Sequence, residues 1–295
     1  MRGARPDRAL EETLERGGIV RRGERAIVAC SGGADSVALA AALAAIAKPM
    51  DLGLALVHVN HGTRRSAWQD ECVAARIAVT LDLPLDVVAL APGAGGEGEL
   101  RATRYDALAS AARRFRATTA FTAHHAEDQS ETVLLALFRG AGPEGVAGMR
   151  ARRPLAGEIE LARPLLRTRS ETLRAYCHAR ALPYCVDPTN ADLELRRNAV
   201  RDVLERIRPL FANLDESIAR AAELAGAELE SHPRAGIRRR VRERLGAEGE
   251  LGDVDFAHVE AAVRAIERGR SGSFLMKTGV RLEIESGTIA GITKG

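Results

Sequence analysis

Short apolar runs alternate with longer amphipathic stretches along the chain up to about residue 213. The apolar runs are rich in Val, Ile and Leu and too short for helices, so they predict buried strands. They lie at 26–30, 52–59, 84–90, 118–123 and 183–186. The intervening stretches predict helices at 6–16, 35–48, 66–81, 99–114, 128–138, 163–180 and from about 193, with loops at 91–98 and 139–149. This alternation predicts an α/β fold with a doubly wound parallel sheet.

The pattern changes after residue 213. Helical periodicity dominates at 217–229, 237–245 and 256–268, and three short strand-like runs follow at 274–277, 280–284 and 288–292. We therefore expect a catalytic domain over 1–213 and a small α+β accessory domain over 214–295. The second stretch contains an arginine run, formed by Arg238, Arg239, Arg240, Arg242 and Arg244. This run is read equally well as a solvated helix face or as a contact to RNA phosphates.

The first predicted strand leads into the sequence CSGGADS at 30–36, and a run of helix formers follows. We expect Gly32 and Gly33 to allow positive φ and a close approach of a ligand to the backbone. The N–H groups of Ala34 and its neighbours, at the start of the helix, attract an anion such as phosphate. The hydroxyl groups of Ser31 and Ser36 add donors.

Asp35 is unusual at such a turn, because a carboxylate repels phosphate unless a divalent cation lies between them. We interpret Asp35 as a Mg²⁺ contact. A Walker loop is excluded because it requires a lysine in the turn, and the nearest one is Lys48. The alternative is an ordinary turn in which Ser or Asp caps the helix.

Three further polar clusters follow predicted strands, where parallel α/β sheets bind their ligands. HVNHGTR at 58–64 ends the second strand. This is the position for the base and ribose of a nucleotide, so His58, Asn60 and His61 are candidate contacts. Taken alone, the histidines are more often structural.

AHHAEDQSET at 123–132 combines two histidines with two acids that are three residues apart on a predicted helix. Asp128 and Glu131 therefore share one face and suit a metal ion or an ammonium group. His124 and His125 are neighbours in extended chain, so they cannot both point into one site. A capped helix with solvated acids is the alternative.

DPTNADLELRRNAVR at 187–201 places Arg197 and Arg201 four residues apart on one helix face, beside Asn198. Two guanidinium groups at this spacing suit a phosphate or a carboxylate. An exposed basic helix explains the pattern equally well.

The composition of the chain disfavours several classes of function. The chain has 295 residues, a net charge of +3 and 3% aromatic residues, so stacking of bases on several rings is not expected. Its four cysteines are dispersed, at 30, 72, 177 and 185, which disfavours a zinc or iron–sulfur site. The N-terminus has no signal-peptide core and the longest apolar run, 37–47, is too short to cross a membrane. These features predict a cytoplasmic protein without a membrane partner.

Taken together, seven motifs resemble those of the bacterial tRNA(Ile)-lysidine synthetases, in their order and approximate spacing. They are SGGADS, HVNHGTR, RATRYDAL, AHHAEDQSETVLL, RGAGPEGVAGM, RPLL and DPTNADLELRRNAVR. The resemblance covers residues 24–210 and is weak beyond 214. Thr189 stands where the family more often has Ser, and it keeps the hydroxyl group.

This resemblance implies the fold of the PP-loop ATPases, which is like that of the adenine nucleotide alpha hydrolases. It implies that ATP adenylates the wobble cytidine of a tRNA(Ile) with a CAU anticodon, releasing pyrophosphate. Free L-lysine then displaces AMP and forms lysidine, which changes codon reading from AUG to AUA and amino-acid identity from Met to Ile. ATP, Mg²⁺, this tRNA and lysine are the implied ligands, and a homodimer is left open.

The resemblance also implies roles for the candidate residues. The turn at 31–36 would hold the pyrophosphate portion of ATP, with Asp35 on Mg²⁺. Asp128 and Glu131 would hold the ammonium groups of lysine, and one of them, or His124 or His125, would deprotonate the attacking amine. Arg197 or Arg201 would contact the ATP phosphates or the lysine carboxylate.

Three other functions are weighed against this one. A PP-loop tRNA 2-thiolase is the nearest, although such enzymes usually need paired cysteines. An amide-forming ATP pyrophosphatase would act on a small molecule. A non-catalytic RNA- or nucleotide-binding module would show no ATP turnover.

Overall fold

The computed structural model describes residues 6–60, 67–90, 97–185, 195–231, 233–247, 256–275 and 280–294. Two compact units divide the chain: one contains 1–130 and 149–219, and the other contains 131–148 and 220–295. We describe each unit by itself.

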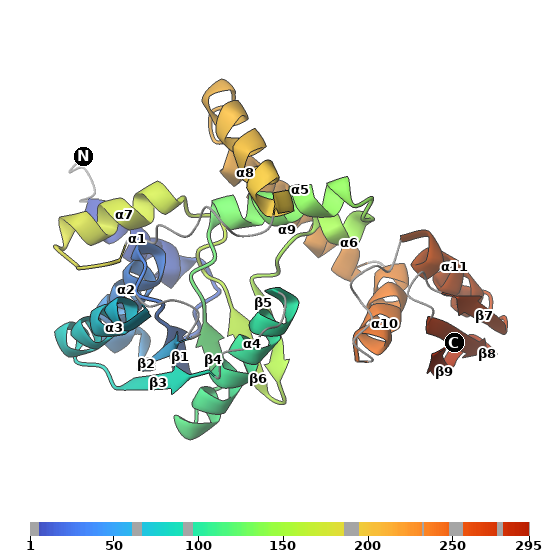
Figure 1. Cartoon of the computed structure of the whole chain (residues 1–295), viewed down its shortest axis with the longest axis horizontal. Helices are drawn as coiled ribbons and strands as arrows, with labels where there is room; N and C mark the ends of the chain where they lie inside the picture. The colour runs from blue at the N-terminus through green and yellow to red at the C-terminus, as the bar shows by residue number, and fades with distance from the viewer. Residues whose placement is uncertain are drawn as a thin grey trace. The chain divides into compact units, whose positions relative to one another are not determined.

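The first unit is built on a six-stranded sheet of order β3-β2-β1-β4-β6-β5 (Figure 1). Five strands are parallel, and β5 pairs antiparallel with β6 at one edge. The bounds are β1 Arg25–Ala29, β2 Gly53–Asn60, β3 Leu85–Ala89, β4 Thr119–Phe121, β5 Arg152–Ala156 and β6 Ile159–Ala162. Because β1 lies between β2 and β4, the chain winds outward from it in both directions. The predicted α/β fold with a mostly parallel, doubly wound sheet is confirmed.

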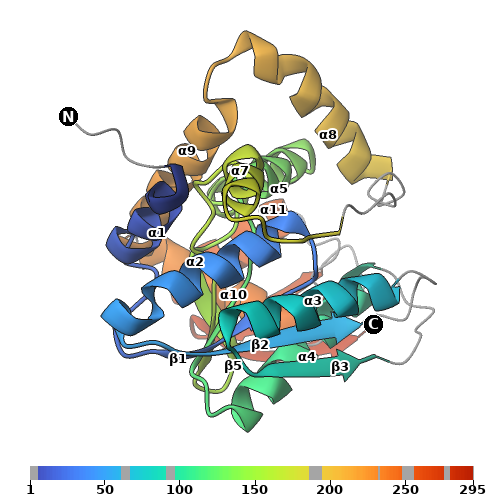
Figure 2. The ribbon, with the colours of Figure 1, turned by 90° about the vertical axis from the view of Figure 1, so that its left-hand side faces the viewer.

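Helices cover both faces of this sheet. The α1 (Pro6–Arg16), α2 (Ala34–Met50), α3 (Ala67–Leu81) and α7 (Ser170–Ala179) helices share one buried cluster, and α4 (Glu97–Arg114) packs on the other face (Figure 2). Side chains alternate along β1, so Ala26 and Val28 join the first cluster and Ile27 joins the second. This two-sided burial explains why the strand is apolar at every position.

The later helices of the first unit begin near their predicted positions. They are α5 (Ala126–Phe138), α8 (Leu195–Ile207) and the start of α9 (Leu214–Ser231). A 3-10 turn at Arg208–Leu210, which the sequence pattern did not predict, lies between α8 and α9. The division between the two units runs through α5 and α9.

The second unit contains α6 (Pro143–Val146), α10 (Pro233–Ala247), α11 (Phe256–Glu267) and the antiparallel strands β7 (Gly272–Leu275), β8 (Val280–Glu285) and β9 (Thr288–Lys294). Its core joins Val241 and Leu245 of α10 with Val259 and Val263 of α11 and Leu282 of β8. The three strands occur close to where the sequence pattern placed them.

Several predicted elements are wrong. The stretch at 152–162 forms the β5–β6 hairpin, which we did not predict, and α7 begins at Ser170 rather than at 163–166. The predicted strand at 183–186 is reduced, within its described part, to one bridge between Cys185 and Gly33. The expected loop at 139–149 contains the short helix α6, and Pro49 lies inside the last turn of α2 instead of ending it. The predicted loop at 91–98 falls largely outside the described residues.

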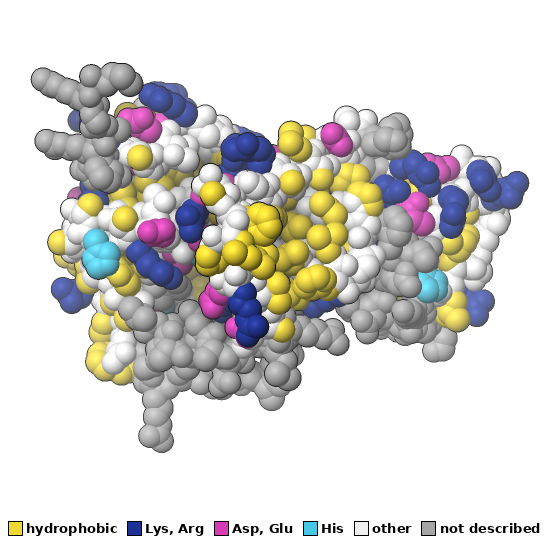
Figure 3. All heavy atoms as spheres, turned by 90° about the horizontal axis from the view of Figure 1, so that it is seen from above, with side chains coloured by type: hydrophobic (Ala, Val, Ile, Leu, Met, Phe, Trp, Pro, Cys, Tyr) yellow, Lys and Arg dark blue, Asp and Glu magenta, His cyan; other side chains and the backbone are white. Residues whose placement is uncertain are grey.

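No helix in the described part of the chain is long and apolar enough to span a bilayer. Figure 3 shows apolar side chains gathered on one face of the molecule among charged ones. Large apolar residues that are more than half exposed include Trp68, Phe138, Leu210 and Phe211.

Candidate functional site

The turn between β1 and α2 follows from the conformation of one glycine. Gly32 has φ of +89°, whereas Gly33 is extended with φ of −77° and serves as the N-cap of α2. The expectation of positive φ at Gly33 is therefore wrong. No side chain caps the helix at Gly33, so the alternative of a Ser or Asp cap is wrong as well.

Gly32 is also required by its surroundings. A Cβ atom at this position would lie 2.9 Å from the carbonyl oxygen of Asp70 and 3.0 Å from its Cα, both backbone atoms of α3. The same test at Gly33 finds only the Ser31 hydroxyl at 3.7 Å. Packing of α3 against the turn therefore excludes any side chain at Gly32.

Two serines hold the shape of this turn. The Ser36 hydroxyl donates to the Gly33 carbonyl oxygen at 2.9 Å and accepts the Ser31 N–H at 3.0 Å. The Ser31 hydroxyl lies 3.1 Å from that of Ser36 and accepts the Gly33 N–H at 3.4 Å. Ser36 is buried and Ser31 is exposed, so Ser36 stabilises the turn while Ser31 faces outward with the first N–H groups of α2. This arrangement suits an anion.

His125, just after β4, is surrounded by three carboxylates. Its Nε2 lies 3.6 Å from Asp35 Oδ2 and 3.5 Å from Asp128 Oδ2, and its Nδ1 lies 2.9 Å from Glu127 Oε2. The Glu127 contact is off the hydrogen-bond direction of Nδ1, so it is mainly electrostatic. We call these four residues the acidic cluster.

The acidic cluster controls the charge of His125. Burial alone would lower the pKa of His125, but the Glu127 contact and the charges of Asp128 and Asp35 outweigh burial and raise it to about 9. Burial likewise opposes ionisation of Glu127, yet His125 lowers the pKa of Glu127 to about 2. At neutral pH the cluster therefore holds an imidazolium among carboxylates.

Asp35 has the features of a cation ligand. Burial raises its pKa, and among the residues that the structure describes its Oδ1 atom is buried without a hydrogen-bond partner. No group of three or more His, Cys, Asp or Glu residues in the described ranges is arranged to hold a metal alone. Asp35 therefore fits Mg²⁺ held jointly by one carboxylate and substrate phosphates, which is a common arrangement.

His124 faces different groups from its neighbour. Its Nδ1 lies 3.0 Å from the Thr122 hydroxyl oxygen. Burial, together with the charges of Arg163, Arg104 and Arg101, lowers the pKa of His124 well below its usual value. His124 is therefore neutral at pH 7, whereas His125 is charged.

The polar residues at the end of β2 are partly engaged within the protein. His58 is buried, and its Nδ1 lies 2.8 Å from the Cys30 carbonyl oxygen, so it supports the start of the phosphate turn. Asn60 donates to Glu71 at 3.3 Å. His61 lies outside the described residues, and contacts of this segment to a base or ribose remain a prediction.

The other predicted site residues lie further along the chain. Glu131 is buried one turn beyond Asp128 on α5, and Arg197 and Arg201 are partly buried on α8. All three interact with other residues of the protein. Their roles in a site remain predictions.

Sequence reasoning missed Glu127, which also accepts the N–H and hydroxyl of Ser170 at 3.1 and 3.2 Å. Its only signal was its place beside Asp128 in the AHHAEDQSET motif. Helix spacing argues against neighbours sharing a face, but His125 precedes the helix and reaches both acids.

A parallel sheet whose first strand ends in a glycine–serine turn, with no Walker lysine and an aspartate beside the anion position, defines a nucleotide-binding protein of the PP-loop class. The sequence pattern of the family described as the PP-loop domain matches residues 5–207. The chain belongs to this family and, within it, to the tRNA(Ile)-lysidine synthases.

Three curated relatives illustrate this membership, and each is named tRNA(Ile)-lysidine synthase. That of Salinispora tropica is 44% identical over 68% of this chain and 62% of its own length. That of Alkalilimnicola ehrlichii is 41% identical over 70% and 49%, and that of Thermosynechococcus vestitus is 34% identical over 79% and 73%. The chain thus spans about half to three-fifths of the length of the first two.

A solved structure supports the fold. The U34-tRNA thiolase NcsA from Methanococcus maripaludis, with its [4Fe-4S] cluster, superposes with a TM-score of 0.63 at 17% identity. The match covers 75% of this chain and 78% of the thiolase. At this identity the likeness is one of fold alone.

Proposed function

We propose that this chain is an ATP-dependent tRNA(Ile)-lysidine synthase that acts on the wobble cytidine of a CAU anticodon. The cytidine O2 attacks the α-phosphate of ATP, a P–O bond breaks, and pyrophosphate leaves. The ε-amine of free L-lysine then attacks C2, AMP leaves with the oxygen, and the amine loses a proton. We place this activity in the cytoplasm, where all three substrates occur.

The observation that carries the proposal is the acidic cluster beside an anion-binding turn. An adenylated cytidine and an ammonium-bearing nucleophile need opposite charges within one site. The turn at 31–36 supplies donors for phosphate, and Asp35, Glu127 and Asp128 supply carboxylates for a cation. The curated relatives named above support lysine as that cation's source.

Asp35 would hold Mg²⁺ together with the ATP phosphates, because its buried Oδ1 needs a partner. When bound, that ion would neutralise negative charge that develops on the leaving pyrophosphate. Ser31 and the N–H groups at the start of α2 would bind the phosphate oxygens as hydrogen-bond donors. Ser36 would keep the turn in shape.

His125 is our candidate proton acceptor. In the free protein it is already protonated at neutral pH, since its pKa is about 9. Entry of a second cation, such as the lysine ammonium, repels the imidazolium and lowers its pKa. His125 then gives up its proton to solvent and becomes able to accept the proton of the attacking amine. Glu127 keeps the ring oriented.

Lysine incorporation tests the proposal directly. With ATP and Mg²⁺, we expect labelled lysine to be fixed on the CAU isoleucine tRNA, with release of AMP, and not on the CAU methionine tRNA. Asp35→Asn should abolish incorporation, whereas Asp51→Asn, at the exposed end of the same helix, should retain it. Folded protein that binds ATP but fixes no lysine would exclude lysidine formation.

A tRNA thiolase remains the alternative that shares this fold. The measured likeness to the solved thiolase is 17% in sequence, against 41% and 44% to two lysidine synthases. The lysidine synthase assignment is therefore better supported.

A further inference from the structure

Four arginines surround Tyr105 of α4. The guanidinium carbons of Arg101 and Arg104, on the same helix, lie 5.6 and 5.7 Å from the centre of the tyrosine ring, and that of Arg153 on β5 lies 4.8 Å away. Arg163, directly after β6, donates from Nη2 to the Tyr105 hydroxyl at 3.4 Å. We call these five residues the arginine cluster.

Arg163 forms the buried end of the cluster. It is 2% exposed, its Nη1 donates to the Arg150 carbonyl oxygen at 2.9 Å, and its Nε is buried without a partner. Within the described parts of the chain, none of the four arginines is ion-paired with a carboxylate. A buried guanidinium without a counter-ion is unfavourable, so the site lacks a negative charge.

Three arginines elsewhere in the protein are neutralised by carboxylates. Arg152, one residue before Arg153, pairs with Glu24 at 2.7 Å and Glu160 at 2.8 Å.

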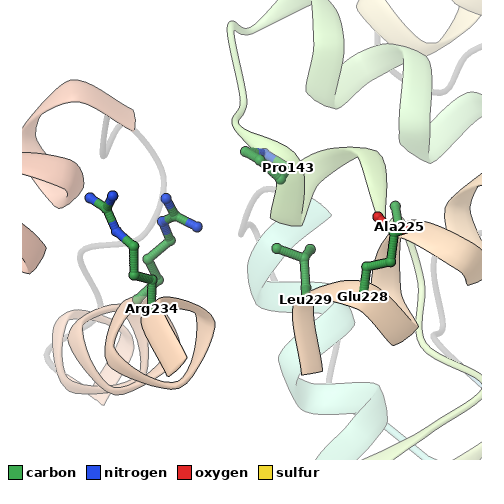
Figure 4. Close-up of a pocket in the computed structure, with 6 residues that line it drawn as sticks. Pro143, Ala225, Glu228, Leu229 and Arg234 are labelled. Carbon is green, nitrogen blue, oxygen red and sulfur yellow. The ribbon is translucent and has the colours of Figure 1, made fainter. Parts of the chain in front are cut away.

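A pocket of about 330 Å³ in the second unit is lined by Pro143, Ala225, Glu228, Leu229, Arg234 and Arg238 (Figure 4). Arg234 and Arg238 both pair with Glu260 there, so that pocket does not need an anion.

The pKa values of Tyr105 and His124 respond to the charge of these arginines. Burial alone would raise the pKa of Tyr105, but Arg101 and Arg163 outweigh it and lower this pKa to about 7. His124, after β4, is kept neutral by burial and by Arg163, Arg104 and Arg101. The cluster thus favours a phenolate and opposes an imidazolium, as expected for a site that attracts anions.

The arginine cluster is open on one side. Arg101 is exposed, and Arg104 and Arg153 are partly exposed, whereas Arg163 is buried. Arg163 follows β6, just as the phosphate turn follows β1, so both lie at the carboxyl edge of the parallel strands. Ligands of such sheets bind along this edge.

We propose that the arginine cluster is a second anion site, in which Arg101, Arg104, Arg153 and Arg163 bind a phosphate group of a substrate. Guanidinium groups that converge from three elements suit a tetrahedral anion better than a planar carboxylate. The phosphate belongs either to the RNA backbone or to the nucleotide. The naming of these two sources of the phosphate rests on the proposed function, whereas the anion site itself does not.

The ionisation of Tyr105 provides the assay. In full-length protein labelled with ¹³C at the tyrosine Cζ, the Tyr105 signal, identified by its loss in Tyr105→Phe, should titrate near neutral pH. Inorganic phosphate at constant ionic strength should raise this pKa, because the bound anion replaces the charge of the phenolate. Arg101→Gln/Arg153→Gln should weaken this response to phosphate about tenfold or more, and Arg113→Gln, on an exposed part of α4, should leave it unchanged.

Separate additions identify the source of the phosphate. A shift of the Tyr105 signal with a CAU anticodon stem-loop RNA alone assigns the site to the RNA backbone, and a shift with Mg²⁺-ATP alone assigns it to the nucleotide. The proposal is overturned if phosphate has no effect, if acetate or L-lysine is as effective, or if the double variant responds like the wild type. These measurements need no lysine transfer, so they remain informative if the proposed reaction fails.

Discussion

At the scale of single residues, the protonation of His125 differs between the folded and the unfolded chain. The ring lies against Glu127 and near Asp35 and Asp128, and its pKa of about 9 exceeds the value near 6.5 expected in an unfolded chain. The folded state therefore binds a proton that the unfolded state releases between these two values.

We predict that His125 makes stability depend on pH. Its contribution is fully present below pH 6.5 and is lost as pH rises to about 9. The free energy of unfolding from urea titrations should fall over this range by up to about 3 kcal/mol more in the wild type than in His125→Gln. His178→Gln, at an exposed histidine of α7, is the control for removal of an imidazole. Parallel pH profiles for wild type and His125→Gln would contradict the raised pKa.

Gly32 supports a second prediction. Gly32→Ala would combine positive φ with a Cβ atom 2.9 Å from the backbone of Asp70, whereas Gly23→Ala has positive φ in open space. We expect about 1 kcal/mol of destabilisation for Gly23→Ala and a clearly larger loss, with weaker ATP binding, for Gly32→Ala. Urea unfolding measures the stability of both variants, and calorimetric titration measures their affinity for ATP. Equal losses of stability for Gly32→Ala and Gly23→Ala would show that α3 moves to accommodate the added methyl group.

At the scale of elements, the β5–β6 hairpin extends the sheet and brings arginines to its edge. The β5 strand was missed because two arginines and a proline, at 152–154, are compatible with an antiparallel edge strand but not with a buried parallel one. The β6 strand, which pairs parallel with β4, was missed because it is only four residues long. The side chain of Arg152 fastens β5 to the rest of the sheet through Glu24, Glu160 and Thr119.

We predict that this buried network contributes far more to the free energy of unfolding than the surface ion pair beside it. Arg152 and Arg21 both bind Glu160, but the Arg152 side chain is 10% exposed and that of Arg21 is 57% exposed. Arg152→Gln should lower the free energy of unfolding by about 3–5 kcal/mol because buried Glu24 loses the guanidinium of its ion pair, and Arg21→Gln by at most about 1 kcal/mol. Urea denaturation of both variants tests this prediction, and similar losses of stability for the two would contradict it.

At the scale of the whole molecule, the arginine run of the second unit has divided roles. Arg238 pairs with Glu144 at 3.3 Å and with Glu260, so it stabilises the unit itself. Arg240 and Arg244, one turn apart on α10, are exposed. We propose these two as contacts to tRNA phosphates.

The salt dependence of tRNA binding tests this proposal. Arg240→Gln and Arg244→Gln should each weaken binding and reduce the slope of log K against log salt by about one unit per lost phosphate contact. Arg113→Gln, on an exposed part of α4 in the first unit, serves as a control for a general change in charge. Unchanged slopes in the α10 variants would place the tRNA contacts elsewhere.

Local sequence was sufficient for β1 to β4, for the helices between them and for the phosphate turn. Apolar runs report burial directly, and the glycine–serine turn is specified by consecutive residues around Gly32. The family resemblance, carried by seven ordered motifs, is confirmed by the match over 5–207. These features depend on neighbours in the chain, which is why they can be read without the fold.

Only the tertiary structure showed how the charges are paired. Asp35 meets His125, and Tyr105 meets Arg153 and Arg163, across sequence separations that no local pattern encodes. An arginine either pairs with a carboxylate of the protein or can bind an anion from solution. Which of the two applies depends on its burial and on its distance from the nearest carboxylate, and both are set by packing. The sequence alone therefore determined the class of protein and its phosphate turn, whereas the fold decided which side chains carry charge in the site.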